Sequence, residues 1–576
     1  MRSIWEVCPI IVGIDLGTTN SLIACFQDGC PIVIPNVHGE MLTPSVVSIG
    51  ESGEVYVGKI AKERLVSHPA HTADIFKRSM GTKKQYRLGE SSFTPEELSS
   101  FIIKKLKEDA QSYLGRDIQE AVISVPAYFN DAQRRATKAA GELAGLKVER
   151  IVNEPTAASL AYGFNEEREH AKFLVFDLGG GTFDVSILEK YNNVMEVRAV
   201  AGDIFLGGED FTTILMQMFI EKAGVDIGRM SLIDLAVLRK AAETAKCAFS
   251  ERQTVQVCAA LDGATYEAEI GMRDYEKRCE DLLSRLRLSI KNAISDAAIS
   301  LSDIDNIILV GGATKLPIVK NFVGKLFGRF PLSSISPDEV VGIGTAVHAA
   351  LKERNQAITE VVLTDVCPFT LGIESARKLQ NGLYYSDLYT PIIERNSTIP
   401  ISRVERFYTL HDNQKDIHCK ILQGESRKAS ENMLLGELTV PIPKAPAGEE
   451  PVDVRFAYDI NGILEVEVTV VSSGVKKSIV IEKNPGIFTK EEIGQKLEAL
   501  SSFKIHPREK EEYRLLLSRG ERMYQESLGN LRAVLGRAIT DFEVTLDAQD
   551  DKRIREHAKK FSELLDKIEK ERGYDF

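Results

Sequence analysis

An apolar segment that ends in Asp-Leu-Gly occurs twice in this chain. The first copy, residues 11–19, reads IVGIDLGTT, and the second, residues 174–182, reads LVFDLGGGT. Each predicts a buried strand that breaks into a glycine turn, where backbone N–H groups can approach a polyphosphate because glycine has no Cβ atom and tolerates positive φ. Asp15 and Asp177 would add oxygen ligands for a hydrated divalent cation. One such turn arises by chance, whereas the repeat predicts a nucleotide held between two related lobes.

Composition narrows the possible classes. The 576 residues exceed one domain, and 43% hydrophobic with 27% charged residues is an ordinary globular composition. A formal net charge of −12 argues against nucleic acid or an anionic membrane as the main partner. The eight cysteines form no CxxC pair, which indicates neither a zinc site nor a disulfide framework. Since no stretch approaches the roughly 20 apolar residues of a membrane span, we expect a cytoplasmic protein.

The pattern of the sequence changes along the chain. Alternating apolar strands and helical segments predict α/β lobes over residues 1–357. Residues 367–486 show period-two strands with a turn signal at Asn461-Gly462, which predicts an antiparallel β-sandwich. The apolar linker between them, residues 358–366, is expected to dock. Residues 487–576 are charged and helical, and their apolar stripe favours helices that pack on one another over a partner groove. The stripe consists of Leu528, Leu531, Leu535, Ile539, Phe542 and Leu546.

Four motifs are similar to those of the DnaK-type heat-shock chaperones. They are DLGTTN at 15–20, NEPTAA at 153–158, DLGGGTFD at 177–184 and LVGGAT at 309–314. The resemblance covers almost the whole chain and implies a multidomain protein, in which an actin-like α/β ATPase of duplicated lobes precedes a β-sandwich peptide-binding domain and a short α-helical lid. It implies a monomer that hydrolyses ATP at a weak basal rate, stimulated by peptide and by a J-domain co-chaperone. Within the family the chain most resembles the bacterial HscC branch.

For the nucleotide site, the resemblance implies ATP or ADP with Mg²⁺, and K⁺ as a further candidate ion near Asp184. Lys77 would orient the attacking water, although without the family it is an ordinary lysine in a basic run. Mg²⁺ would be held through water by Asp15, Glu154 and Asp177, which with Lys77 and Thr182 form the predicted catalytic group. The other predicted nucleotide-binding residues are Gly17, Thr18, Thr19, Asn20, Gly179, Gly180, Gly181, Gly207, Gly208, Glu243, Lys246, Ser250, Gly311, Gly312, Lys315 and Asp338.

The chain departs from the family pattern beside the predicted adenine site. Family members often stack arginines on the adenine, whereas Cys247 and Lys315 occupy the matching positions here. Lysine cannot stack as a planar guanidinium does, so we expect weaker adenine binding and faster nucleotide release. Residues 251–275 are shorter than the family's exchange-factor hairpin, which leaves the need for an exchange factor open.

The β-sandwich is expected to bind extended client polypeptides through main-chain hydrogen bonds and an apolar pocket. By resemblance, the pocket is lined by Ile373, Phe407, Ile417 and Cys419 and arched over by Ala376 and Leu410. A bulky Ile417 floor predicts a narrower choice of substrate than that of a general chaperone. Coupling to the nucleotide would run through Val361, Val362 and Leu363, and Arg150 and Asp365 match positions that respond to a J-domain partner.

Two other functions fit the duplicated ATPase lobes. A small-molecule kinase would need a site for a substrate hydroxyl beside the γ-phosphate, and it gives no account of the apolar linker, β unit and helical tail. An actin-like filament protein meets the same objection. An ATP-dependent chaperone that binds extended apolar segments accounts for the whole chain.

Overall fold

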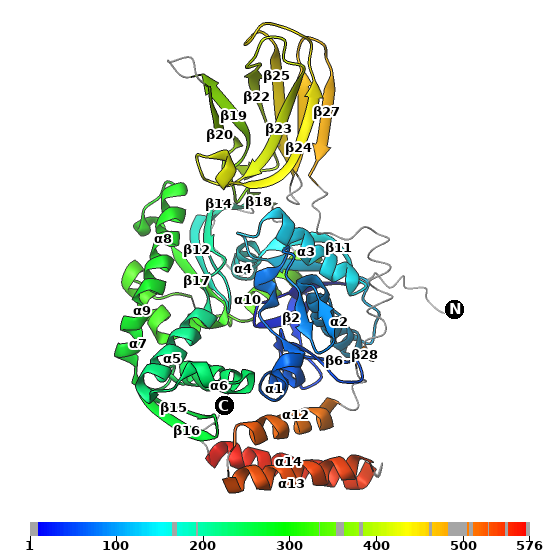
Figure 1. Cartoon of the computed structure of the whole chain (residues 1–576), viewed down its shortest axis with the longest axis vertical. Helices are drawn as coiled ribbons and strands as arrows, with labels where there is room; N and C mark the ends of the chain where they lie inside the picture. The colour runs from blue at the N-terminus through cyan, green and yellow to red at the C-terminus, as the bar shows by residue number, and fades with distance from the viewer. Residues whose placement is uncertain are drawn as a thin grey trace, which may run out of the picture.

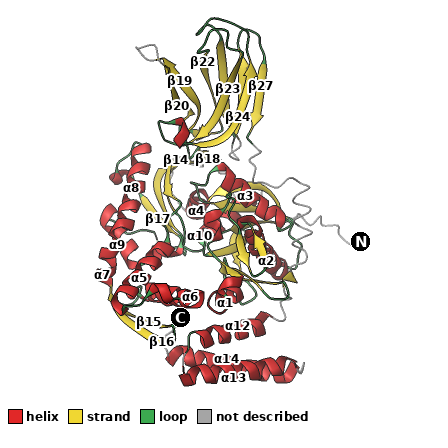
Figure 2. Cartoon of the chain, in the orientation of Figure 1, coloured by secondary structure: helices red, strands yellow, loops and turns green. Residues whose placement is uncertain are grey.

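The computed structural model of the chain is shown in Figures 1 and 2. It describes residues 10–163, 170–191, 194–332, 334–352, 362–378, 384–459, 464–481, 504–505, 511–527, 529–547 and 551–571. Two mixed sheets flanked by helices form the centre of the molecule, with a β-sandwich at one end and a helical bundle at the other (Figures 1 and 2). Among the described residues, no helix combines the length and apolar character needed to cross a membrane.

The first lobe is built on a sheet of order β11-β10-β1-β2-β3. These strands are β1 (Ile11–Asp15), β2 (Asn20–Gln27), β3 (Cys30–Ile34), β10 (Glu120–Val125) and β11 (Lys147–Asn153). Its helices are α1 (Lys59–Ser67), α2 (Pro95–Leu114), α3 (Asp131–Leu143), α4 (Glu154–Gly163) and α10 (Val340–Lys352). Its smaller strands are β4 (Thr43–Pro44), β5 (Val47–Ile49), β6 (Glu54–Val57), β7 (Thr72–Ala73), β8 (Tyr86–Leu88) and β9 (Ser91–Phe93). Capping boxes fix the first turns of α2 and α3.

The second lobe is built on a sheet of order β17-β12-β13-β14-β18-β21. Four of its strands are β12 (His170–Leu178), β13 (Phe183–Tyr191), β14 (Val194–Asp203) and β17 (Asn306–Val310). Its helices are α5 (Gly208–Ala223), α6 (Leu232–Ala248), α7 (Met272–Arg278), α8 (Glu280–Asp296) and α9 (Pro317–Phe327). The hairpin of β15 (Thr254–Leu261) and β16 (Ala264–Gly271) extends from α6, within the segment that is short by resemblance.

The repeated sequence segment folds in the same way in both lobes. β1 pairs antiparallel with β2 and parallel with β10, and β12 pairs antiparallel with β13 and parallel with β17. Residues 11–14 of β1 and 173–178 of β12 are buried, as the β-branched and apolar residues of both copies predict. Asp15 and Asp177 therefore lie at equivalent ends of two equivalent strands.

The β-sandwich consists of sheets β20-β19-β23-β24 and β22-β25-β26-β27. Their strands are β19 (Leu371–Lys378), β20 (Tyr384–Ile393), β22 (Ile401–Tyr408), β23 (Asp416–Gln423), β24 (Met433–Pro441), β25 (Pro451–Tyr458), β26 (Leu464–Val470) and β27 (Lys476–Val480). β25 pairs antiparallel with β26, as the turn signal predicts, although the turn itself lies outside the described residues. Alternate residues of β25 and β26 point into the sandwich core, which matches the period-two pattern.

The linker forms part of the second sheet. β18 (Val362–Val366) pairs in parallel with β14, placing Val362 opposite Val194. On its other side, β18 pairs antiparallel with β21 (Thr398–Ile399), a strand from the sandwich end of the chain. This pairing agrees with the expectation that the apolar linker docks, although Val361 lies outside the described residues.

The helices α12 (Glu511–Gln525), α13 (Gly529–Asp547) and α14 (Asp551–Glu571) form what we call the C-terminal bundle. Its core contains Leu535, Ile539 and Phe542, with Leu531 and Leu546 packed against them. This confirms the prediction that the apolar stripe serves helix packing, with Leu528 outside the described residues. Nearby, β28 (Lys504–Ile505) pairs in parallel with β6 of the first lobe.

Candidate functional site

Three aspartates gather where the two hairpins face each other. Asp15 ends β1, while Asp177 and Asp184 lie opposite one another in the β12–β13 register. Burial, reinforced by Glu154, raises the pKa of Asp15 to about 7 and that of Asp184 to about 8, and the pKa of Asp177 rises for the same reasons. Asp177 Oδ2 and Asp184 Oδ1 are buried and have no hydrogen-bond partner within the described structure. Such a cluster of buried carboxylates fits a cation that is held through its water ligands.

Lys77 and Glu154 join this cluster as a buried ion pair. Lys77 Nζ lies 2.9 Å from Glu154 Oε1, and the residues are 3% and 7% exposed. Lys77 Nζ also lies 5.6 Å from the centroid of the Phe129 ring. The charge of Glu154 raises the pKa of both Asp15 and Asp177, and the charge of Lys77 lowers it. These predicted catalytic side chains therefore share one electrostatic environment. Among the described residues, no group of three or more His, Cys, Asp or Glu could hold a metal ion directly.

The threonines of the repeat lie where the two hairpins meet. Thr18 and Thr182 are 7% and 9% exposed. A Cβ atom added to Gly180 would lie 2.2 Å from Thr19 Cγ2, so the two turns approach each other closely. Asn20 begins β2 beside them, opposite Pro44 in β4.

Glycine turns of the second lobe pack directly on one another. The Gly208 N–H donates to Gly179 O at 2.9 Å, so the turn before α5 lies on the turn after β12. A Cβ atom at Gly207 would come within 2.5 Å of Gly181 N, and one at Gly311, where φ is +83°, within 2.4 Å of Leu178 O. These positions require glycine because backbone approaches backbone.

The predicted adenosine side has a hydrogen-bonded core on α5 and α6. Lys246 Nζ lies 2.6 Å from Glu243 and donates to Gly208 O at 3.0 Å. Thr212 donates to Glu243 at 2.6 Å. The prediction that Ser250 shares this helix is wrong, because α6 ends at Ala248 and Ser250 lies in the turn that follows, where its hydroxyl donates to the carbonyl of Cys247 in α6.

The two departures from the family pattern have local partners. Lys315 forms an ion pair with Asp338, and a Cβ atom at Gly312 would lie 2.8 Å from an Asp338 oxygen. Cys247 is exposed at the surface and its Sγ lies 3.7 Å from Glu243; partial desolvation by the surrounding atoms, together with this neighbouring carboxylate, raises the pKa of the thiol. The ammonium and the thiol are therefore engaged by carboxylates of the same site.

Sequence reasoning missed charged residues that join the lobes. Arg78 donates to Gly181 O at 2.7 Å and pairs with Asp210 at 2.7 Å. Arg239 of the second lobe pairs with Asp74 of the first at 2.7 Å. The basic run around Lys77 was visible, but no local pattern identifies partners more than a hundred residues away.

The predicted coupling residues lie between the linker and the first lobe. Asp365 accepts hydrogen bonds from Asn153 at 2.5 Å and Thr156 at 3.4 Å. Arg150 is close enough for the Asp365 charge to counteract the lowering of its pKa by burial. The backbones of Val362 and Leu363 pair with β14, and their side chains are outside the described set.

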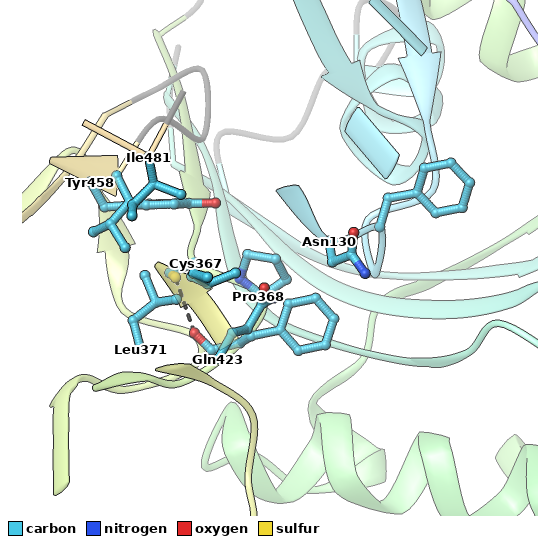
Figure 3. A pocket seen from close by; sticks show the side chains of 11 residues that line it. Asn130, Cys367, Pro368, Leu371, Gln423, Tyr458 and Ile481 are labelled. Carbon is cyan, nitrogen blue, oxygen red and sulfur yellow. Dashed lines mark hydrogen bonds between the residues drawn. The ribbon is translucent and has the colours of Figure 1, made fainter. Parts of the chain in front are cut away.

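Further contacts connect the sandwich with both lobes. A small crevice lies between Asn130 of the first lobe and Cys367 and Pro368, which follow the linker (Figure 3). Near it, the rings of Tyr128 and Phe369 are 4.6 Å apart. On the second lobe, Asp296 of α8 accepts hydrogen bonds from Arg395 at 2.8 and 3.0 Å and from Asn396 at 2.9 Å. None of these contacts was predicted.

The predicted peptide-site residues belong to the sandwich but have different environments. Ile373 and Cys419 are buried in its core, with Phe407 and Ile417 packed partly buried against them. Of the two predicted arch residues, Ala376 lies at a bulge of β19 and Leu410 lies half-buried beyond β22. Phe407 is on the opposite sheet from the other three pocket residues.

The fold defines a protein of two related lobes with facing hairpins, joined through a β-strand linker to a β-sandwich and a helical bundle. The model of the Hsp70 protein family matches residues 11–88 and 83–573. The chain is 44% identical over 491 residues to the chaperone protein DnaK of Thermotoga neapolitana, covering 83% of this chain and 81% of that protein. It is 42% identical over 485 residues to DnaK of Thermosipho africanus, covering 82% and 79%.

The chain therefore belongs to the Hsp70 family. It is an Hsp70-type molecular chaperone and an ATPase, as the sequence motifs predict. The match includes the sandwich and the helical bundle, which the kinase and filament alternatives leave unexplained.

Proposed function

We propose that the cleft between the hairpins binds ATP and that the docked linker transmits its state to a peptide site in the sandwich. The observation that carries the proposal is β18, which pairs with the second-lobe strand β14 and with β21. The domains would be residues 1–357, 358–366, 367–486 and 487–576, with the nucleotide-binding and peptide-binding residues predicted above.

In the cleft, Asp15, Asp177 and Glu154 would hold hydrated Mg²⁺, and Asp184 would lie near K⁺. The buried carboxylate oxygens that lack partners support a cation here. Mg²⁺ would supply charge neutralisation on the phosphates. The chain's own residues would do the rest: Lys77, fixed by its ion pair, would orient the attacking water, and the glycine turns with Thr182 would position the phosphates.

At the peptide site, the bulk of Ile417 supports a narrower substrate choice than that of a general chaperone, and so a specialised role. Placement in the HscC branch and a cytoplasmic location belong to the same proposal. Arg150 of the first lobe and Asp365 of the linker, which interact electrostatically, would carry the response to a J-domain co-chaperone.

The test is single-turnover ATP hydrolysis with and without a short apolar peptide. Val362→Asp places a charge on the linker strand, and it should abolish stimulation by peptide while the basal rate persists. Val471→Asp makes the same change at an exposed residue of the sandwich and should keep the stimulation. Thr182→Ala should reduce the basal rate itself. A chain whose hydrolysis ignores peptide in every variant would refute the coupling.

A further inference from the structure

The C-terminal bundle contacts both lobes. α12 packs along α1 of the first lobe, and Figure 1 shows it lying beneath α1 and α6 at the end of the molecule opposite the sandwich. Arg522 of α12 forms an ion pair with Glu63 of α1. Glu526, which directly follows the last residue of α12, lies 2.8 Å from Nζ of Lys240 in α6 of the second lobe.

These contacts form a continuous chain of charges from one lobe to the other. Arg522 Nη1 lies 3.0 Å from Glu526, so the order is Glu63, Arg522, Glu526, Lys240. The side chains of Arg522 and Glu526 are 5% and 7% exposed, and those of Glu63 and Lys240 are 16% and 25% exposed. Because these charges are shielded from water, removal of one partner leaves the other uncompensated, which costs more than breaking an exposed surface salt bridge. Arg522 is also held by Glu569 of α14, so the charge chain is anchored in the bundle itself.

The two ends of this charge chain belong to the two lobes between which nucleotide binding is proposed. Lys240 is on the same helix as Glu243 and Lys246 of the predicted adenosine side. Its neighbour Arg239 already reaches across to Asp74 of the first lobe at 2.7 Å, which locates α6 at the contact between the lobes. Release of a nucleotide from between two lobes requires those walls to separate. For α1 to separate from α6, either the ion pair of Glu63 with Arg522 or the ion pair of Glu526 with Lys240 would have to break.

We propose that the C-terminal bundle is a clamp across the nucleotide cleft and that its docking slows nucleotide release. The proposal rests on the proposed binding of nucleotide in that cleft and adds a regulator of it. The ion pairs of the bundle lie on α1 and α6 and not on the glycine turns, so undocking of the bundle would free the lobes while the residues predicted to contact the phosphates stay in place. This chain has Cys247 and Lys315 where family members often stack arginines on the adenine. The docked bundle would let it retain its nucleotide without them.

The test measures dissociation of fluorescently labelled ADP, and of a labelled ATP analogue that is not hydrolysed, from the full-length chain after addition of excess unlabelled ATP. Lys240→Met removes the second-lobe end of the clamp and should raise the dissociation rate of at least one nucleotide about fivefold. Glu526→Gln removes its partner and should give a similar increase. Lys325→Ala removes a 77% exposed lysine of the same lobe and should change neither rate.

The double variant of Lys240 and Glu526 separates the clamp from a local effect on α6. If the pair acts as one bridge, the double variant dissociates no faster than the faster single variant. The clamp proposal would be overturned if the increases in dissociation rate of the two single variants multiplied in the double variant. It would also be overturned if both single variants had dissociation rates within 1.5-fold of the wild type. Those outcomes would leave nucleotide binding itself intact, whereas failure of the wild type to bind either labelled nucleotide would instead refute the proposed function.

Discussion

The two ends of the ATPase lobes are attached to their neighbouring units by different kinds of interaction. At the sandwich end, most contacts are not ionic: a backbone ladder, aromatic packing of Tyr128 on Phe369 and the hydrogen bonds of the half-buried Asp365 stand beside an ion pair of Arg395 with Asp296. At the bundle end, they centre on ion pairs around Arg522. Backbone hydrogen bonds and buried carboxyl groups resist salt, whereas ion pairs weaken with it. The two attachments should therefore respond to different perturbations.

The largest effect is expected from Arg522→Met. This change leaves Glu63 and Glu569 without their shared cation, and breaking a buried pair costs about 3–5 kcal/mol. Amide hydrogen exchange in α12 should accelerate by about a hundredfold or more, while β18 remains protected. Arg537→Met in α13, where the exposed Arg537 side chain donates to Ala533 O of its own helix, is the matched control. Unchanged exchange in α12 would contradict an ionic attachment.

Asp365→Asn should loosen the sandwich end instead. The amide keeps the size of the carboxyl group but loses its charge, and it cannot accept on both oxygens from Asn153 and the Val366 N–H. We expect the free energy of linker docking to weaken by about 1–3 kcal/mol, and this should be seen as a weaker stimulation of ATP hydrolysis by peptide. Nucleotide dissociation should be unaffected, and a change in dissociation equal to that of Lys240→Met would contradict the separation of the two ends.

Acidification should act through His348, a buried residue of α10. Burial, with Arg150 nearby, lowers the pKa of His348 to about 3. The unfolded chain binds a proton near pH 6.5 and the folded chain does not, so stability is full above pH 6.5 and falls below it. At pH 5.5 this amounts to about 1.4 kcal/mol. In His348→Leu, the melting temperature should fall less between pH 7.5 and 5.5 than it does in the wild type. An equal fall in both proteins would show that other groups cause the loss of stability.

The smallest effect is expected from salt. Raising NaCl from 0.05 to 0.5 M should speed nucleotide dissociation by about threefold, because it screens the charge chain of the clamp. In Lys240→Met the same increase in salt should have less effect, and linker variants should retain the wild-type response. Equal salt dependence in Lys240→Met and the wild type would show that other charges control release.

Local patterns predicted the elements better than the contacts between them. The repeat predicted both hairpins because strand, glycine turn and aspartate are adjacent in sequence, and the apolar stripe predicted the packing of α13 in the same way. Lys77 was placed only by family resemblance, since its partner Glu154 is far along the chain. The bridge between Lys240 and Glu526 has no periodic signature at all. Ser250 was misplaced because spacing alone does not reveal that α6 ends at Ala248.

The pairing of β18 with both β14 and β21 makes one hydrogen-bonded sheet that crosses from the second lobe into the sandwich end of the chain. Within such a ladder, a strand is either in register or released, because a slip of one residue turns every side chain to the opposite face. The linker therefore cannot behave as a graded spring between the two units. If the linker transmits the nucleotide state as proposed, it would act as a latch with two positions, and a population of molecules would divide between them instead of occupying intermediate degrees of attachment.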